Sequence, residues 1–138
     1  MILLDTSGLL SAIDAGQRHH AACVEALAGA APPLLLSPFV LAELDYLLAT
    51  QVGNHAELAL LEEVARGAYR LEPFGGREVG RATEIIRRYA KLSVGLADAS
   101  IVVLAERHGV REVLTLDERH FRVLRAGGRR FRILPADA

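Results

Sequence analysis

Two short apolar runs, each leading into an aspartate, constrain most strongly how this chain can fold. The run Ile2–Leu4 is followed at once by Asp5, and a run from Val113 to Leu116 is followed by Asp117. Short apolar runs of this kind are typical of strands buried inside a sheet. In open α/β sheets, ligands bind beyond the carboxyl ends of the strands. We therefore expect both aspartates at one edge of a sheet.

Helical patterns alternate with strand patterns along the rest of the chain. Ser37 and Pro38 form a helix-start signal, with serine as N-cap and proline at the first helical position. The predicted helices cover 19–28, 38–50, 77–91 and 97–108, and the last of them is closed by Gly109. A further helix is predicted between 38–50 and 77–91, capped by Asn54 and with an apolar stripe of Leu58, Leu61, Val64 and Ala65. The further predicted strands are 34–36, 69–74 and 131–134, the last preceded by a turn at 127–128.

This alternation favours an α/β sandwich with a mainly parallel five-stranded sheet flanked by helices. The chain has 138 residues, no internal repeat and no linker-like tract, so we expect a single domain over 1–138.

The net charge of −1 argues against a nucleic-acid binder that works by bulk charge. Cys23 is the only cysteine, so no internal disulfide can form. Without a signal peptide pattern or a membrane-length apolar run, we expect a soluble, cytoplasmic protein.

Two further acids lie on helices that approach the same edge of the predicted sheet. Glu43 lies about two turns into the helix that follows the second strand, in the mainly apolar segment Phe39–Leu48. Asp98 lies in the first turn of a helix that leads to the fourth strand, and a corner at Gly95 would bring it to this edge. Glutamate is rarely buried unless it is paired, so we expect Glu43 to face a site. Asp45 should point elsewhere and be solvated.

Four carboxylates on one edge would repel one another unless a cation neutralised them. A pair of charges about 4 Å apart costs roughly 4 kcal/mol at an effective dielectric constant of about 20. Oxygen ligands suit Mg²⁺ or Mn²⁺, whereas zinc prefers histidine and cysteine. Mg²⁺ retains several waters, one of which can attack a phosphodiester. The pattern therefore predicts a metal-dependent nuclease site.

Other interpretations of the same residues stay open at this stage. An aspartate at a strand end is commonly a turn or capping residue, and Asp98 could simply favour a helix N-terminus. A haloacid-dehalogenase-like phosphatase would need a second aspartate at position 7, which is Ser7. A receiver domain would need a lysine late in the chain, where the only lysine is Lys91. An inactive interaction module would not need all four acids.

Four segments resemble the motifs of one nuclease family. They are Asp5-Thr6-Ser7, Pro38–Leu44, Gly95–Ser100 and Leu114–Phe121, and together they span essentially the whole chain in the family's order. The sequence thus resembles PIN-domain ribonucleases, and in its last motif the VapC-type toxins of VapBC toxin–antitoxin systems. The segment around Glu43 is similar to an actinobacterial VapC subgroup.

The resemblance implies a PIN-like three-layer fold and assigns roles to individual residues. It makes Asp5, Glu43, Asp98 and Asp117 the catalytic and metal-binding acids, with Mg²⁺ as cofactor and Mn²⁺ as a substitute. Ser7 would orient a metal-bound water, and Thr115 would be a supporting hydroxyl. The implied activity is a toxin endoribonuclease that cuts structured RNA, with ribosomal RNA favoured over tRNA. An RNA-processing nuclease outside a toxin–antitoxin pair is the alternative.

Partners follow from the same resemblance. It implies a homodimer and a hetero-oligomer with a VapB-type antitoxin, whose tail would lie across the acidic site. The region 107–132 carries eight arginines and three acids, and Arg119 and Arg122 are the predicted RNA-binding residues because they follow Asp117 closely.

Overall fold

A five-stranded parallel sheet forms the middle layer of the computed structural model, which describes all residues 1–138. The strand order is β3-β2-β1-β4-β7, and every neighbouring pair is parallel. The strands of this sheet are β1 (Ile2–Leu4), β2 (Leu34–Leu36), β3 (Arg70–Leu71), β4 (Glu112–Leu114) and β7 (Arg132–Leu134). A separate antiparallel hairpin consists of β5 (Arg125–Ala126) and β6 (Arg129–Arg130), joined by the predicted turn. The predicted α/β fold class is confirmed.

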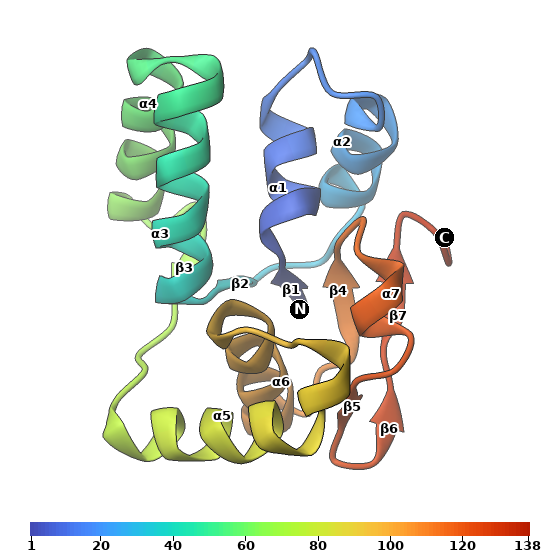
Figure 1. Ribbon diagram of the computed structural model, residues 1–138. Helices are drawn as coiled ribbons and strands as arrows, with labels where there is room; N and C mark the ends of the chain where they lie inside the picture. The colour runs from blue at the N-terminus through green and yellow to red at the C-terminus, as the bar shows by residue number, and fades with distance from the viewer.

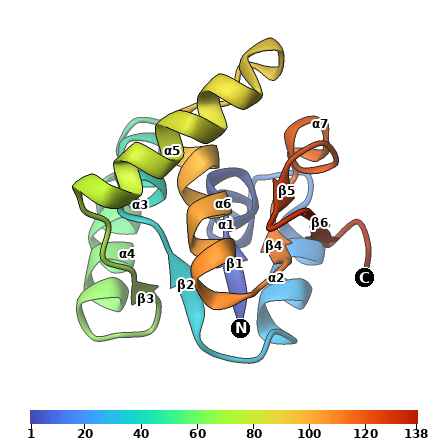
Figure 2. The same ribbon diagram turned by 90° about the horizontal axis from the view of Figure 1, so that it is seen from below.

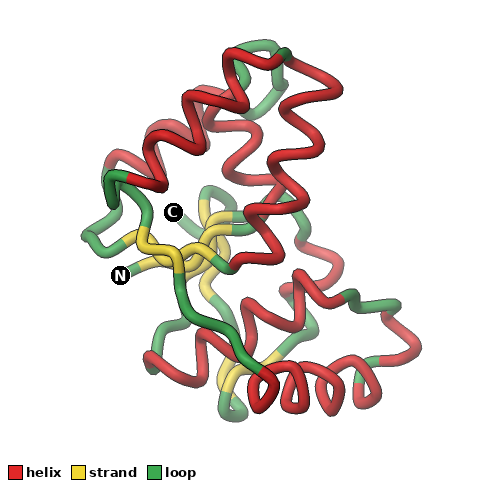
Figure 3. Tube along the Cα trace, turned by 90° about the vertical axis from the view of Figure 1, so that its left-hand side faces the viewer, coloured by secondary structure: helices red, strands yellow, loops and turns green.

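Helices cover both faces of the sheet. The first four lie on one face and α5 and α6 lie on the other, so the molecule has three layers (Figures 1 and 3). The helices are α1 (Thr6–Ile13), α2 (His20–Ala28), α3 (Pro38–Leu47), α4 (Asn54–Ala65), α5 (Gly76–Arg88), α6 (Leu96–His108) and α7 (Glu118–Phe121). A π-helical turn (Leu48–Val52) extends α3, and a 3₁₀ turn (Ala90–Leu92) follows α5. None of the helices combines the length and apolar composition needed to cross a membrane.

The core explains why β1 and α6 are apolar almost throughout. All three residues of β1 are buried, because the strand lies at the centre of the sheet between β2 and β4. Seven successive residues of α6, Ala99–Ala105, are buried as well. Figure 2 shows α6 lying against the strands with α5 across it, so α6 is enclosed on both sides. Asp98 lies at the point where this buried helix begins.

The strand order places a switch point between β1 and β4. From β1 the chain proceeds outward to β2 and β3, and after α6 it returns to the other side of β1 as β4. Successive connections therefore leave the carboxyl ends of β1 and β4 in opposite directions, which opens a crevice between them. Asp5 follows β1 directly, and Thr115 follows β4.

Several local predictions are confirmed, and others are wrong. Ser37 caps α3 by accepting a 3.1 Å hydrogen bond from the amide of Phe39, and Gly109 ends α6 in a left-handed conformation with φ of 65°. Helix α1 was not predicted, because its sequence TSGLLSAI mixes small and apolar residues without a clear stripe. Gly53, not Asn54, occupies the N-cap of α4. The apolar stripe of α4 is also shifted, since Leu60 is its buried residue and Leu58 is 49% exposed.

Candidate metal-binding active site

Asp5 is the most deeply buried acid of the site, with only 5% of its surface exposed. It occupies the N-cap of α1, yet its side chain makes no capping hydrogen bond. Instead its Oδ2 accepts a 2.6 Å hydrogen bond from the hydroxyl of Thr115 and a 3.2 Å hydrogen bond from that of Ser7. Burial raises the pKa of Asp5 to about 6, against the opposing effect of the Thr115 hydrogen bond. A buried carboxyl group held in this way has a strong affinity for a cation.

Backbone amides beyond β4 fix the two hydroxyls that bind Asp5. The amide of Leu116 donates to Ser7 Oγ at 3.0 Å, and the amide of Asp117 donates to Thr115 Oγ1 at 2.9 Å. Each hydroxyl thus accepts a hydrogen bond from the backbone and donates one to the carboxylate of Asp5. Thr115 therefore lies where its hydroxyl can hold Asp5 in place. Ser7, for which the sequence predicts a role in orienting a metal-bound water, donates its hydroxyl hydrogen bond to Asp5.

Gly8 allows α1 to approach β4 closely enough for this network to form. A Cβ atom at this position would lie 2.5 Å from the carbonyl oxygen of Leu114 and 2.8 Å from the Cγ of the same residue. Any side chain at position 8 would therefore push α1 away from the end of β4. The requirement comes from a contact between segments far apart in the sequence, so the sequence alone did not reveal it.

Asp98 is brought to the same edge by the start of α6. It is the third residue of that helix, with Gly95 at the N-cap, so the predicted corner at Gly95 exists. A buried hydrogen bond of 2.6 Å between the hydroxyls of Ser37 and Ser100 joins the starts of α3 and α6. Burial raises the pKa of Asp98, and the negative charges of Asp117 and Glu43 add to the effect while His120 opposes it. The acids are therefore close enough to interact electrostatically.

Asp117 lies beyond the end of β4, where it caps α7. Its Oδ1 accepts a 3.0 Å hydrogen bond from the amide of His120. Its Oδ2 lies 2.8 Å from Nδ1 of the same histidine, and that nitrogen also lies 3.1 Å from Oδ2 of Asp98. His120 therefore stands between two of the four acids, a contact that the sequence analysis did not anticipate. The signal in the sequence that could have predicted this contact is the Asp-x-x-His spacing of Asp117 and His120 at a helix start.

Glu43 is placed differently from the prediction. It is exposed, and its neighbour Leu44 is the residue of α3 that enters the core. The orientation of α3 therefore turns Glu43 to the rim of the site and not into a buried position. It still lines the same cleft as the three aspartates. Asp45 is partly buried and lies next to Glu57 of α4, where its charge and hydrogen bonding raise the pKa of Glu57, so it is not simply solvated.

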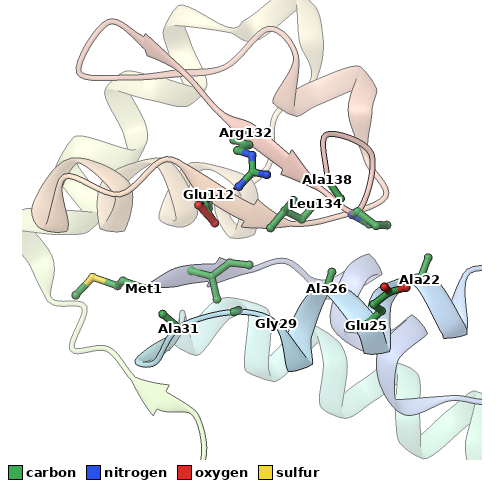
Figure 4. Close-up of a pocket in the computed structure, with 13 residues that line it drawn as sticks. Met1, Ala22, Glu25, Ala26, Gly29, Ala31, Glu112, Arg132, Leu134 and Ala138 are labelled. Carbon is green, nitrogen blue, oxygen red and sulfur yellow. Dashed lines mark hydrogen bonds and ion pairs between the residues drawn. The ribbon is translucent and has the colours of Figure 1, made fainter.

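The acidic cleft has a volume of about 380 Å³ and is bounded by α1, α3 and the start of α6. A larger hollow of about 580 Å³ lies elsewhere, between α2 and the strands β1, β4 and β7 (Figure 4). Its polar groups are mainly Glu25 and the Glu112–Arg132 pair, whose charged atoms lie 3.2 Å apart and neutralise each other. It lacks converging groups with chemical function, so the acidic cleft is the better candidate for catalysis.

The sequence matches the PIN domain family over residues 2–126. This chain belongs to the PIN-domain family. Ribonuclease VapC26 of Mycobacterium tuberculosis is 48% identical over 135 residues, which are 97% of this chain and 100% of the relative. The recognition of a VapC-type PIN nuclease from the sequence motifs is therefore confirmed.

Solved structures show the same fold. VapC20 of M. tuberculosis, described as a toxin that cleaves the sarcin-ricin loop, superposes with a TM-score of 0.79 at 23% identity, covering 85% of this chain and 90% of that one. A chain of VapBC2 from Rickettsia felis superposes with a TM-score of 0.67 at 19% identity, covering 96% of this chain and 98% of that one. At these identities the likeness establishes the PIN fold alone.

The two arginines predicted to bind RNA differ in their surroundings in this PIN domain. Arg119 is exposed on α7 and forms no ion pair. Arg122 instead binds Asp137 through two hydrogen bonds of 2.7 and 2.8 Å and also contacts Glu118 at 2.7 Å. Its guanidinium group would have to leave these partners to reach a phosphate. Arg119 is therefore the more available of the two.

The donor set of this PIN domain fits a divalent cation. Asp98, Asp117 and His120 each offer a ligand atom, and these atoms lie within 4.8 Å of one another. Nδ1 of His120 is buried and has no hydrogen-bond partner, despite its closeness to two carboxylates. A buried polar atom without a hydrogen bond, beside two carboxylates of which Asp98 has a raised pKa, is what a site prepared for a cation should contain.

Proposed function

We propose that this PIN domain is a divalent-metal-dependent endoribonuclease whose catalytic acids are Asp5, Glu43, Asp98 and Asp117. The observation that carries the proposal is the convergence of these acids on one cleft at the β1/β4 switch point. Burial raises the pKa of both Asp5 and Asp98, which opposes keeping them charged without a cation. Carboxylate oxygens favour Mg²⁺ or Mn²⁺.

Each acid has its own part in holding the cation. Asp5 is fixed by Thr115 and Ser7, so its carboxylate offers a preorganised ligand. Asp98 and Asp117 approach from the starts of α6 and α7, and Glu43 approaches from the rim on α3. When bound, the cation supplies Lewis acidity and an activated water for hydrolysis of the phosphodiester bond. The exposed position of Glu43 leaves its side chain free to turn toward the cleft.

The substrate we propose is a structured RNA whose exposed loop enters the cleft. Aromatic residues make up only 5% of the chain and the net charge is −1, so there is little means of capturing single strands indiscriminately. Arg119 on α7 is next to the site and free to contact a flanking phosphate. By resemblance to VapC-type toxins, we favour ribosomal RNA over tRNA as the target, in the cytoplasm.

The biological role we propose is that of the toxin in a type II toxin–antitoxin pair. This role is supported by the names of the relatives, since the similar sequence is named Ribonuclease VapC26 and one similar structure is a chain of a VapBC2 complex. We infer a homodimer and an antitoxin that covers exposed apolar side chains on the early helices, such as Val24, Tyr46 and Leu58. The antitoxin tail would lay a basic side chain across the acids.

Mapping of RNA ends tests the function directly. The wild-type chain and the Asp98→Asn variant are induced separately in cells, and new RNA ends are located across the transcriptome. We expect one dominant cut in a structured RNA with the wild type and none with Asp98→Asn, while Glu62→Gln on the exposed face of α4 behaves as wild type. Cleavage of messenger RNA at many unpaired sites, with rRNA and tRNA intact, would refute the proposed target. Activity of Asp98→Asn in the presence of EDTA would refute the metal site.

Two measurements test the assembly. Light scattering of the purified chain should give the mass of a dimer at micromolar concentration, and a monomer would contradict the homodimer. The antitoxin should lose inhibition when its C-terminal tail is removed. An antitoxin without its tail that still inhibits fully would contradict the position proposed for the tail.

A further inference from the structure

His120 is an unexpected member of the acidic site. Its ring comes from α7 and lies between Asp98 of α6 and Asp117, with 17% of its side chain exposed. Its Nδ1 is 3.1 Å from Oδ2 of Asp98 and 2.8 Å from Oδ2 of Asp117, yet it has no hydrogen-bond partner. The ring therefore places a buried nitrogen at ion-pair distance from two carboxylates, with no hydrogen bond to either.

The other ring nitrogen shows where the proton of the neutral ring is. Nε2 of His120 lies 2.9 Å from the carbonyl oxygen of Leu92. A carbonyl oxygen can only accept, so Nε2 carries the proton and donates it. In the neutral ring, Nδ1 then presents a lone pair to the carboxylates. A lone pair facing two carboxylates is stable only with a positive charge between them.

The distances suit a cation in that place. With metal–ligand bonds of about 2.1 Å, adjacent ligands of an octahedron lie roughly 3.0 Å apart. The two separations between Nδ1 and the carboxylate oxygens are 2.8 and 3.1 Å. Histidine ligands of metals commonly donate their other N–H to a backbone carbonyl, which fixes the tautomer and the ring orientation. The bond to Leu92 has this form.

We propose that Nδ1 of His120 is itself a ligand of the divalent cation, beside Asp98 and Asp117, and that it makes the site prefer Mn²⁺ to Mg²⁺. The proposal rests on the function proposed above and adds a nitrogen to an otherwise all-oxygen donor set. Mg²⁺ strongly prefers oxygen ligands, whereas imidazole binds transition metals well, so the nitrogen selects between the two ions.

Pulsed electron paramagnetic resonance of the Mn²⁺-loaded protein tests the contact without depending on activity. A directly bound imidazole gives ¹⁴N modulation of the Mn²⁺ signal, and labelling with ¹⁵N-histidine replaces it with ¹⁵N modulation. We expect this nitrogen signal in the wild type and in His19→Gln, which alters an exposed histidine before α2. We expect it to vanish in His120→Gln. A wild-type spectrum that shows bound Mn²⁺ without nitrogen would overturn the proposal, and would fit a protonated His120 that is only an ion-pair partner.

Calorimetric titration gives the second readout. His120→Gln should weaken Mn²⁺ binding on the order of 10–100-fold and Mg²⁺ binding much less. Equal losses for both ions would contradict the predicted preference. Should His120→Gln fail to fold, as judged by circular dichroism, the ¹⁵N-labelled wild type alone decides whether histidine is bound. If Asp98→Asn binds both metals as tightly as the wild type, the proposed metal site itself fails; if metal binding needs Asp98 but shows no nitrogen, only the role of His120 fails.

Discussion

Thr115 Oγ1 donates a 2.6 Å hydrogen bond to Oδ2 of Asp5, which ties the carboxyl end of β4 to that of β1. Both side chains are buried, with 1% and 5% of their surfaces exposed. The same hydroxyl accepts from the amide of Asp117, so one side chain sets the positions of two proposed metal ligands. The positions of these two acids therefore depend on the packing of β1 against β4.

Replacing Thr115 should disturb both acids together. In Thr115→Val the carboxylate of Asp5 loses a donor and the amide of Asp117 loses its acceptor, so we expect a loss of about 1–3 kcal/mol in unfolding free energy. We also expect metal affinity to fall on the order of tenfold. Urea denaturation and calorimetric metal titration measure the two effects. Thr115→Ser keeps the hydroxyl and should behave nearly as wild type; equal damage in both variants would show that the methyl group matters instead.

Asp5 should make the metal-free protein less stable as the pH rises. Its folded pKa of about 6 exceeds the ordinary value of 3.8, so the folded state holds this proton more tightly than the unfolded state does. The two states bind it equally below about pH 4, and the folded state loses stability between about pH 4 and 6, by up to roughly 3 kcal/mol. Asp5→Asn should therefore raise the melting temperature in EDTA at pH 8 and change it little at pH 4.

Asp14→Asn provides the matched control for that experiment. Asp14 is a partly exposed residue at the C-cap of α1, and hydrogen bonds from Gln17 and Gly16 lower its pKa, so its substitution should not stabilise the protein at pH 8. Adding Mn²⁺ should reverse the order of the wild type and Asp5→Asn, since only the wild type keeps all ligands. A gain for Asp5→Asn of the same size at both pH values would show that charge burial is not its cause.

Gly8→Ala should separate α1 from β4. The added methyl group would lie 2.5 Å from the carbonyl oxygen of Leu114, a backbone atom that cannot move without shifting the strand. We expect a loss of about 1–3 kcal/mol in unfolding free energy, together with weaker metal binding. Gly80→Ala is the control, because a Cβ at that position of α5 meets nothing within 4 Å. That substitution should stabilise the helix by about 0.5–1 kcal/mol. A stable Gly8→Ala with wild-type metal affinity would contradict the role of close helix–strand contact.

Arg119 and Arg122 should respond differently to substitution. Arg119→Ala should lower kcat/KM for RNA on the order of fivefold or more without changing the melting temperature, because a phosphate contact is lost and no ion pair is broken. Arg122→Ala breaks the contacts with Asp137 and Glu118 and should act mainly on stability, with a small effect because the ion pairs are exposed to solvent. Cleavage assays over a range of salt concentrations and thermal melts distinguish the two. RNA cleavage that depends on Arg122 and not on Arg119 would reverse the assignment.

Local patterns in the sequence were sufficient to predict the sheet and the order of the acidic motifs along the chain. Ile2–Leu4 and the Ser37-Pro38 helix start are recognisable because a buried strand and an N-cap depend on adjacent residues. The four acidic motifs could be found for the same reason, since each lies within a few residues of a strand end or a helix start. The PIN family followed from their order along the chain.

Only the tertiary structure decided how those motifs meet. The exposed position of Glu43 follows from how α3 packs through Leu44, and the need for glycine at position 8 follows from the backbone of β4. The contact of His120 with Asp98 depends on the docking of α7 beside the start of α6. Along the chain, the rest of α6 and the strand β4 lie between these two residues. Such contacts join segments distant in sequence, and they are set by the packing of the whole core, which no local pattern records.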